Sequence, residues 1–243
     1  MTTLRKSIRL SLKTESNINN QSKSKRRNKK IVEYPKMNEI DKYISEKLKK
    51  PVKRSYNLSN QDDARVAILM VGMPGSGKTG TKEICCKNYP FDFVNIEPDE
   101  FLEKFYDNDI KHYPKAFKHA NKLLDRTIEE KRSLVLDGTG VNLFKNIQRL
   151  HDEKYYISLC INLLDKETCK VRTQSRYEKT GRAPNFKYID VVHAKHKINI
   201  PLYLESSMVD DAFVFVNEYS GRRRLICTKR LGNCDIEKIN LYY

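Results

Sequence analysis

Residues 66–79, VAILMVGMPGSGKT, decide the fold of this chain. The first six of them are a continuous apolar run, which is typical of a parallel strand covered on both faces. The other eight, Gly72 to Thr79, are a complete G-x-x-x-x-G-K-[ST] motif in the strand-to-helix context that the motif requires. Its glycines let main-chain N–H groups approach phosphate oxygens, and the dipole of the following helix favours an anion there. The sequence therefore predicts a P-loop that binds a nucleoside triphosphate.

Within the P-loop, two side chains carry the predicted chemistry. Lys78 places a compact positive charge on the β- and γ-phosphates, and the Thr79 hydroxyl group is placed to ligate Mg²⁺. We therefore expect ATP and Mg²⁺ as cofactors. The residues expected to contact the nucleotide are Gly72, Met73, Pro74, Gly75, Ser76, Gly77, Lys78, Thr79 and Thr139.

Strand and helix patterns alternate from residue 63 onward. Further strands are expected at 91–96, 133–136, 155–164 and 212–216. Helices are expected at 78–87, 115–131, 166–179 and 188–205. This alternation predicts an α/β fold, a P-loop NTPase three-layer sandwich around a mostly parallel five-stranded sheet. Residues 222–229, after the turn-forming Ser220-Gly221, are expected to add a hairpin partner.

The second strand ends in IEPDEF, residues 96–101, which places Asp99 just past the carboxyl edge of the predicted sheet. Ligands of open α/β sheets bind at that edge. A carboxylate there can accept the proton of an attacking hydroxyl group during phosphoryl transfer. Asp99 fits a helix N-cap equally well, and Glu97 and Glu100 are alternative candidates for the base.

The third strand ends in LVLDGTG, residues 134–140, with Asp137 in a Walker-B-like position. An acid that follows an apolar strand there can hold Mg²⁺ or its water. A turn aspartate before glycine is the alternative interpretation. Thr139 is expected to contact the nucleotide, or else to serve as a turn residue.

An arginine-rich segment, RTQSRYEKTGR at residues 172–182, follows a predicted helix. Arg176 and Arg182 are predicted to belong to a lid that closes over the phosphates, because the planar guanidinium spreads charge over the oxygens of the transferring group. A solvated helix face is the alternative. His193 and His196 are expected to be core or surface histidines rather than metal ligands.

The net charge of +16 belongs mainly to the N-terminal part of the chain, since residues 1–54 contain 17 Lys and Arg against 5 Asp and Glu. We expect a disordered basic tail at 1–36. An amphipathic helix (Met37 to Lys50) and a linker should fill 37–62, a P-loop kinase domain 63–220, and a C-terminal strand extension 221–243.

The basic cluster KSKRRNKK, Lys23 to Lys30, allows three interpretations. It would bind nucleic acid non-specifically by counterion release, act as a nuclear import signal, or serve as a solvated tail. The six cysteines form no CxxC pair, and no membrane span or signal region is present, so an intracellular protein is expected. Its predicted location is the cytoplasm, or the nucleus through Lys23 to Lys30.

The motifs GMPGSGKT, IEPDEF, LVLDGTG and R-x-x-x-R-Y-E…G-R, in this order over roughly residues 65–218, resemble the zeta-toxin family of P-loop kinases. The resemblance implies that Lys78 is the phosphate lysine and Asp99 the base. It implies that Arg176 and Arg182 stabilise the transferring phosphate. Asp137 stands where the family usually has Glu, and Thr139 follows in the same turn.

The resemblance also implies the reaction. Founding members of the family are bacterial toxins that phosphorylate UDP-N-acetylglucosamine, so an ATP-dependent kinase acting on a hydroxyl-bearing acceptor such as a UDP-sugar is expected. One alternative is a polynucleotide 5′-hydroxyl kinase, since such kinases share the P-loop and the base-bearing second strand. Another is a nucleic-acid-associated protein that binds ATP without transferring phosphate. The sequence does not specify an oligomeric state.

Overall fold

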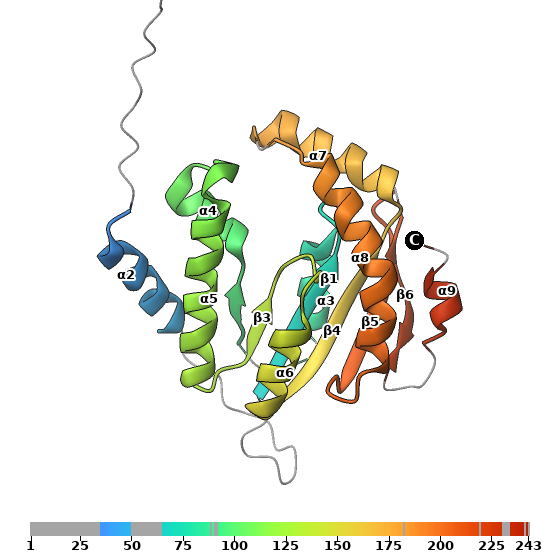
Figure 1. Ribbon diagram of the computed structural model, residues 1–243, viewed down its shortest axis with the longest axis horizontal. Helices are drawn as coiled ribbons and strands as arrows, with labels where there is room; N and C mark the ends of the chain where they lie inside the picture. Colours follow the sequence, from blue (N-terminus) through green and yellow to red (C-terminus); the bar gives the residue numbers. More distant parts are fainter. Residues whose placement is uncertain are drawn as a thin grey trace, which may run out of the picture. The chain divides into compact units, whose positions relative to one another are not determined.

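The apolar run before the P-loop forms a central strand of the sheet. The structure, a computed structural model, describes residues 35–49, 65–87, 89, 92–181, 183–218, 220–229, 234–240 and 242. Within these residues the strands are β1 (Arg65–Gly72), β2 (Val94–Ile96), β3 (Leu134–Leu136), β4 (Tyr155–Leu163), β5 (Asp211–Asn217) and β6 (Arg223–Thr228). They form one six-stranded sheet in the order β2-β3-β1-β4-β5-β6 (Figure 1).

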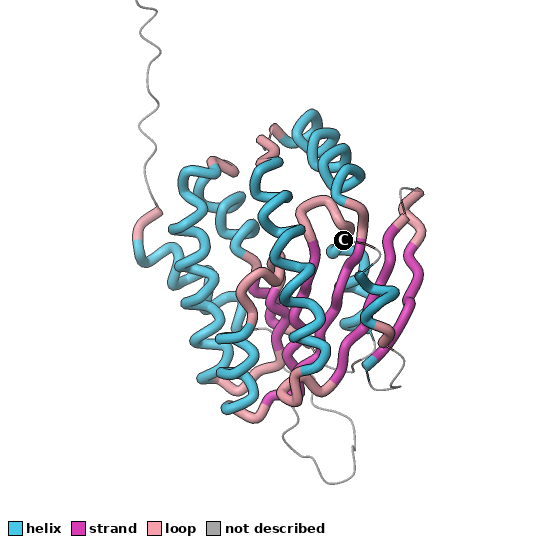
Figure 2. The backbone as a smooth tube through the Cα atoms, turned by 45° about the vertical axis from the view of Figure 1, so that its right-hand side comes forward, coloured by secondary structure: helices cyan, strands magenta, loops and turns pink. Residues whose placement is uncertain are grey.

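The first five strands are parallel, and they confirm the predicted mostly parallel sheet. β6 pairs antiparallel with β5 as the predicted hairpin partner, so it adds a sixth strand at the edge of the sheet (Figure 2). In the register of β1 with β4, Gly72 lies opposite Asn162. The start of the P-loop is therefore next to a polar side chain near the carboxyl end of β4.

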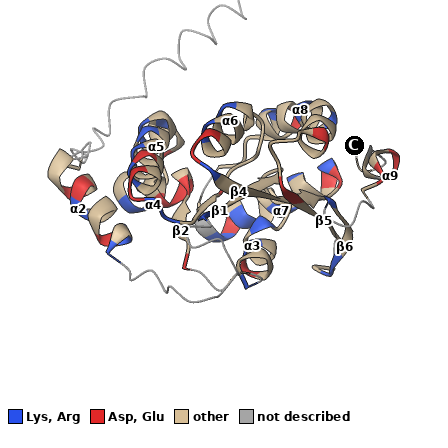
Figure 3. Cartoon of the chain, turned by 90° about the horizontal axis from the view of Figure 1, so that it is seen from below, with Lys and Arg blue, Asp and Glu red and all other residues tan. Residues whose placement is uncertain are grey.

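Helices connect the strands and cover both faces of the sheet. They are α2 (Met37–Leu48), α3 (Lys78–Lys87), α4 (Pro98–Tyr106), the short 3₁₀ helix η1 (Ile110–His112), α5 (Tyr113–Glu129), α6 (Phe144–Asp152), α7 (Lys166–Thr180), α8 (Phe186–Glu205) and α9 (Ile236–Asn240). α5, α6 and α8 lie on one face and α3 lies on the other (Figure 3). This arrangement is the predicted three-layer sandwich. The helices α4, α6 and α9 were not expected from the sequence.

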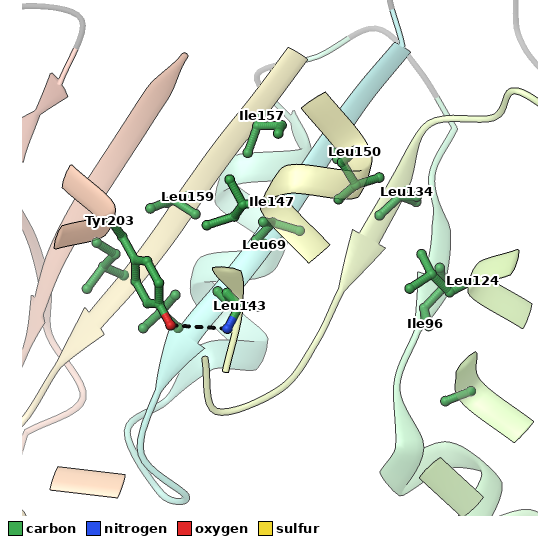
Figure 4. Close-up of a cluster of buried hydrophobic side chains, with 14 of the residues drawn as sticks. Leu69, Ile96, Leu124, Leu134, Leu143, Ile147, Leu150, Ile157, Leu159 and Tyr203 are labelled. Carbon is green, nitrogen blue, oxygen red and sulfur yellow. Dashed lines mark hydrogen bonds between the residues drawn. The ribbon is translucent and has the colours of Figure 1, made fainter. Parts of the chain in front are cut away.

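The two faces of β1 enter two separate hydrophobic clusters, because successive strand residues point to opposite faces. Ala67, Leu69 and Val71 join the large cluster on the α5–α6–α8 side, part of which is shown in Figure 4. Val66, Ile68 and Met70 join a smaller cluster with Cys85 of α3. Burial on both faces explains why the sequence of this strand is apolar without alternation.

The predicted amphipathic helix is present as α2, and its apolar side chains Ile40, Ile44 and Leu48 are buried in the large cluster. Residues 35–243 form one compact unit. The predicted tail lies outside the described residues except for 35 and 36, as does the linker at 55–63. All six cysteines are free thiols. In the part of the chain that is described, no helix is long and apolar enough to cross a membrane.

Candidate active site

A cavity of about 590 Å³ opens at the carboxyl ends of β1, β2 and β3. Three loops that follow these strands line it, and so do the start of α5 and parts of α7 and α8. Its lining residues are Pro74, Gly75, Gly77, Lys78, Thr79, Glu97, Pro98, Asp99, Ile110, Tyr113, Pro114, Asp137, Gly138, Thr139, Arg172, Thr173, Arg176, Ala183, Asn185 and Tyr188. The structure thus brings part of the P-loop together with Asp99, Asp137, Thr139 and Arg176. Gly72, Met73 and Ser76, which were also predicted to contact the nucleotide, are not among the lining residues.

The P-loop side chains divide between the cavity and the core. Lys78 is partly buried, and its Nζ donates hydrogen bonds to the carbonyl oxygens of Gly72 and Met73 at 3.0 and 3.2 Å. Burial lowers the pKa of Lys78, while the carboxylates of Asp137 and Asp99 oppose that shift. Thr79 is exposed to the cavity, whereas Met73 is buried among α7 and α8 side chains. Met73 therefore anchors the loop.

Two buried asparagines support the P-loop from below, and the sequence analysis did not single them out. Asn162 is the last residue but one of β4, and Asn217 is the last residue of β5. The amide nitrogen of Asn217 donates to the carbonyl oxygen of Ser76 and, at 3.2 Å, to Oδ1 of Asn162. The same Oδ1 accepts a hydrogen bond from the Thr81 hydroxyl group of α3. The signal for these residues was a lone amide at the end of each apolar strand.

The three acidic residues after β2 face different surroundings. Glu97 and Asp99 line the cavity, but Glu97 is also paired with Lys82 at 3.3 Å. Glu100 instead contacts α2, where its carboxylate accepts hydrogen bonds from Tyr43 and Lys47. Asp99 occupies the first turn of α4, directly after Pro98. Of the three candidates for the base, Glu97 and Asp99 therefore face the cavity and Glu100 faces α2.

Asp137 lies at the bottom of the cavity with 6% of its surface exposed. Its Oδ2 atom forms an ion pair with Lys82 Nζ at 2.8 Å. Burial lowers the pKa of Lys82, but Asp137 and Glu97 raise it by more, so this lysine stays charged. The sequence analysis did not anticipate this lysine, which lies one helical turn after Lys78.

The residues present fit a magnesium ion. Thr79 and Asp137 supply a hydroxyl and a carboxylate to the same cavity, and hard cations prefer oxygen ligands. No group of three or more His, Cys, Asp or Glu side chains is arranged for a metal among the described residues. Mg²⁺ typically takes one or two carboxylates and completes its shell with water and phosphate, so Thr79 and Asp137 would be sufficient protein ligands.

The turn after β3 is fixed from several sides. The carbonyl oxygen of Thr139 accepts hydrogen bonds from the backbone of Gly72 at 3.1 Å and from Nε2 of the buried His196 at 2.7 Å. The hydroxyl groups of Thr139 and Tyr188 are 3.1 Å apart. Gly140 adopts φ 78°, and a Cβ atom there would meet Val71 at 2.7 Å, so only glycine fits. His196 is thus a core histidine, as predicted.

Two arginines of α7 reach the cavity, four residues apart and therefore on one face of the helix. Arg176 was predicted. Arg172 donates hydrogen bonds to the carbonyl oxygens of Glu218 and, at 3.5 Å, Gly75, so it joins α7 to the P-loop. The helix ends at Gly181, which adopts φ 71°. Arg182, the other predicted lid arginine, lies outside the described residues.

Part of the cavity wall consists of apolar and aromatic groups. Ile110, Tyr113 and Pro114 contribute it from η1 and the start of α5, while Tyr188 faces the cavity from α8. Asn185 also lines the cavity, and its side chain caps α8 by accepting from the backbone of Tyr188 at 2.9 Å. The cavity therefore has charged groups of both signs near the P-loop, and it also has an apolar and aromatic part that suits a flat group.

Comparisons with known proteins agree on one family. The family model described as Zeta toxin matches residues 51–220. Toxin zeta of Streptococcus agalactiae is 24% identical over 199 residues, which covers 73% of this chain and 69% of that protein.

Two solved structures are similar in fold. A structure of the PezAT chromosomal toxin–antitoxin system of Streptococcus pneumoniae matches with a TM-score of 0.67 and 18% identity over 85% of both chains. The AvrRxo1-ORF1:AvrRxo1-ORF2 complex with ATP matches with a TM-score of 0.58 and 15% identity, over 74% of this chain and 62% of that one.

Proposed function

Because the chain belongs to the zeta toxin family, we propose that it is an ATP-dependent kinase that transfers the γ-phosphoryl group to a hydroxyl group of an acceptor. One observation carries this proposal. Lys78 of the P-loop and Asp99 of α4 follow different strands, β1 and β2, and both line one cavity. A phosphate site and a carboxylate that can take a proton are what phosphoryl transfer to a hydroxyl group requires.

The P-loop, Lys78 and the two α7 arginines would hold the triphosphate. Lys78 leaves the loop carbonyls for the β- and γ-phosphates, and Arg172 and Arg176 spread positive charge over the group in transfer. Thr79 and Asp137 would hold Mg²⁺, which when bound neutralises charge on the phosphate oxygens. The fold-related AvrRxo1 complex was solved with ATP, and this supports ATP as the donor.

Asp99 acts as the general base. The acceptor oxygen attacks the γ-phosphorus, the bond from that phosphorus to the bridging β-phosphate oxygen breaks, and ADP leaves. The proton of the acceptor hydroxyl group passes to the Asp99 carboxylate. In this proposal Arg182 supplies a further positive charge that stabilises the phosphoryl group in transfer.

The acceptor we favour is a UDP-sugar such as UDP-N-acetylglucosamine. Family membership supports this choice, and so does the part of the cavity formed by Ile110, Tyr113 and Pro114, since a nucleobase can stack on an aromatic ring. The excess of Lys and Arg in residues 1–54 favours a second candidate, a polynucleotide 5′-hydroxyl kinase.

Label transfer from γ-labelled ATP distinguishes the two candidates. Purified protein with Mg²⁺ is offered a panel of UDP-sugars or a 5′-hydroxyl oligonucleotide, and Lys78→Ala serves as the blank. We expect label on a UDP-sugar, and at least a ~100-fold lower rate for Lys78→Ala because a charge-stabilising group is lost. Label on the oligonucleotide alone would support the second candidate. Transfer equal in wild type and Lys78→Ala would contradict the kinase proposal.

A further inference from the structure

Helix α2 precedes the residues that the family model matches, yet it contacts the helix that carries Asp99. The match begins at residue 51, whereas α2 spans Met37–Leu48. Figures 1 and 3 both show α2 beside α4 and α5 at one end of the sheet. The kinase site therefore has a neighbour that lies outside the residues matched by the family model.

Glu100 of α4 is held by two side chains of α2. Its carboxylate accepts a hydrogen bond from the Tyr43 hydroxyl group and forms an ion pair with Lys47 Nζ at 2.5 Å. The same Lys47 nitrogen donates to the carbonyl oxygen of Asn95 at 3.1 Å. The amide group of Asn95 lies 3.5 Å from Glu100. Lys47 thus links α2 both to β2 and to the first turn of α4.

Packing and charge reinforce these contacts. The Tyr43 ring meets Phe101 and Phe105 edge-on, each with ring centroids 5.5 Å apart. Burial raises the pKa of Glu100, but hydrogen bonds from Lys47 and Tyr43 lower it by more. Glu100 therefore stays ionised and keeps its ion pair with Lys47.

Asp99 immediately precedes Glu100 in the first turn of α4. Successive residues of an α-helix point about 100° apart around its axis, so the direction of one determines the direction of the other. Because Glu100 faces α2, Asp99 faces the cavity that it lines. A rotation of this turn that freed Glu100 from α2 would also move Asp99 away from the phosphate site.

We propose that Lys47 and Tyr43 are positioning residues for the transfer reaction: they hold Glu100 and so direct Asp99 at the acceptor hydroxyl group. The inference rests on the proposed function, in which Asp99 is the base. The position of a reacting group strongly affects the rate, because a displacement of about 1 Å can lower the rate about 100-fold.

A second set of contacts supplies a matched control. Asp41 of α2 forms an ion pair with Lys122 of α5 at 2.6 Å, and Ser45 accepts a hydrogen bond from Arg126 at 3.1 Å. These contacts hold α2 on α5 without involving α4. If α2 only stabilises the fold, losing Asp41 or losing Lys47 should have the same consequences.

The experiment compares Lys47→Met, Lys47→Arg, Tyr43→Phe and Asp41→Asn in the full chain with two readouts. The first is steady-state transfer of label from ATP to UDP-N-acetylglucosamine. The second is amide hydrogen exchange in the segment at residues 96–106. We expect Lys47→Met to lower kcat about 10-fold with the KM for ATP unchanged, and to speed exchange in α4. Tyr43→Phe, which keeps the ring contacts, should show a smaller loss of kcat.

Lys47→Arg should retain most of the wild-type rate, since it keeps the positive charge. Asp41→Asn should change neither the transfer rate nor the hydrogen exchange of α4. Equal effects of Lys47→Met and Asp41→Asn would overturn the inference. If the wild type transfers no phosphate to this acceptor, the favoured acceptor is wrong. In that case amide hydrogen exchange tests the positioning claim. Faster exchange of α4 in Lys47→Met but not in Asp41→Asn supports the claim, and unchanged exchange in Lys47→Met overturns it.

Discussion

His196 is a buried titratable side chain that the proposed reaction does not use. It is 1% exposed, and its Nε2 donates to the carbonyl oxygen of Thr139 in the turn beside the P-loop. Burial lowers the pKa of His196 to about 4, although the hydrogen bond to Thr139 opposes the shift. The imidazole is therefore neutral near pH 7, and its role is to fix the turn.

The first prediction follows from that pKa. The ordinary value of 6.5 applies to the unfolded chain, so the unfolded state binds the proton more readily as the pH falls from 6.5 to 4. The contribution of His196 to stability is present above pH 6.5 and lost across this window, by about 3 kcal/mol in total. His196→Gln, which keeps a donor for Thr139 but cannot be protonated, should flatten the acid dependence of urea unfolding.

The matched control for this prediction is His151→Gln, which changes an exposed histidine. It should retain the wild-type loss of stability between pH 6.5 and 4. A His196→Gln variant with the same pH slope as the wild type would contradict the assignment.

At the residue scale, the sequence predicted well those side chains whose chemistry is set by a local motif. The P-loop, Asp99, Asp137 and Thr139 all follow strands, and parallel strands bring their carboxyl ends to one edge. The pairing of Lys82 with Asp137 could not be predicted in this way, because it depends on the distance between α3 and the end of β3. That distance is a property of the packed sheet.

At the scale of elements, the P-loop is supported by the ends of two strands that follow it much later in the chain. Asn162 and Asn217 are 1% and 3% exposed, and Asn217 donates to Ser76 in the loop. Since an unpaired buried carbonyl group is costly, this amide keeps the loop in its conformation.

We predict that Asn217→Ala raises the KM for ATP and destabilises the protein by about 1–3 kcal/mol, because the Ser76 carbonyl group loses its partner. Kinetics and thermal unfolding measure the two effects. Asn199→Ala is the control, since its amide donates to the Val141 carbonyl oxygen at 2.6 Å but does not reach the P-loop. An unchanged KM for ATP in Asn217→Ala would show that the loop does not depend on this amide.

The elements themselves were predicted unevenly. The long periodic or fully apolar segments β1, β4, α5 and α8 were predicted within a few residues. α4 was not predicted, although a helix N-cap at Asp99 was one of the alternatives, and α6 was missed because it is short and follows a glycine-rich turn. Both are stabilised by burial, through Phe101 and Leu102 in α4 and Ile147 and Leu150 in α6. That burial depends on the neighbours that each helix finds in the fold.

At the scale of the whole molecule, the charge of the chain and its proposed chemistry belong to different segments. We propose that residues 63–220 carry the kinase activity, that 221–243 extend its sheet, and that the basic residues 1–36 act separately. A cationic segment of this composition would bind polyanions by counterion release without reading their sequence.

Deleting residues 1–35 should therefore weaken binding to DNA or RNA at low salt and leave ATP turnover intact. Fluorescence anisotropy with a labelled oligonucleotide at two salt concentrations measures the first effect, and a coupled assay for ADP measures the second. The wild-type affinity should fall steeply with salt, whereas the truncated protein should show a shallow dependence. Binding that survives truncation unchanged would place the nucleic-acid contact elsewhere.

The most direct test of the account is single-turnover transfer by Asp99→Asn, measured with the acceptor that takes label in the wild type and accompanied by a titration of ATP binding. If Asp99 is the base of a P-loop kinase, the rate of transfer falls at least ~100-fold while the affinity for ATP stays close to the wild-type value. Transfer by Asp99→Asn at nearly the wild-type rate would contradict this account and direct attention to Glu97.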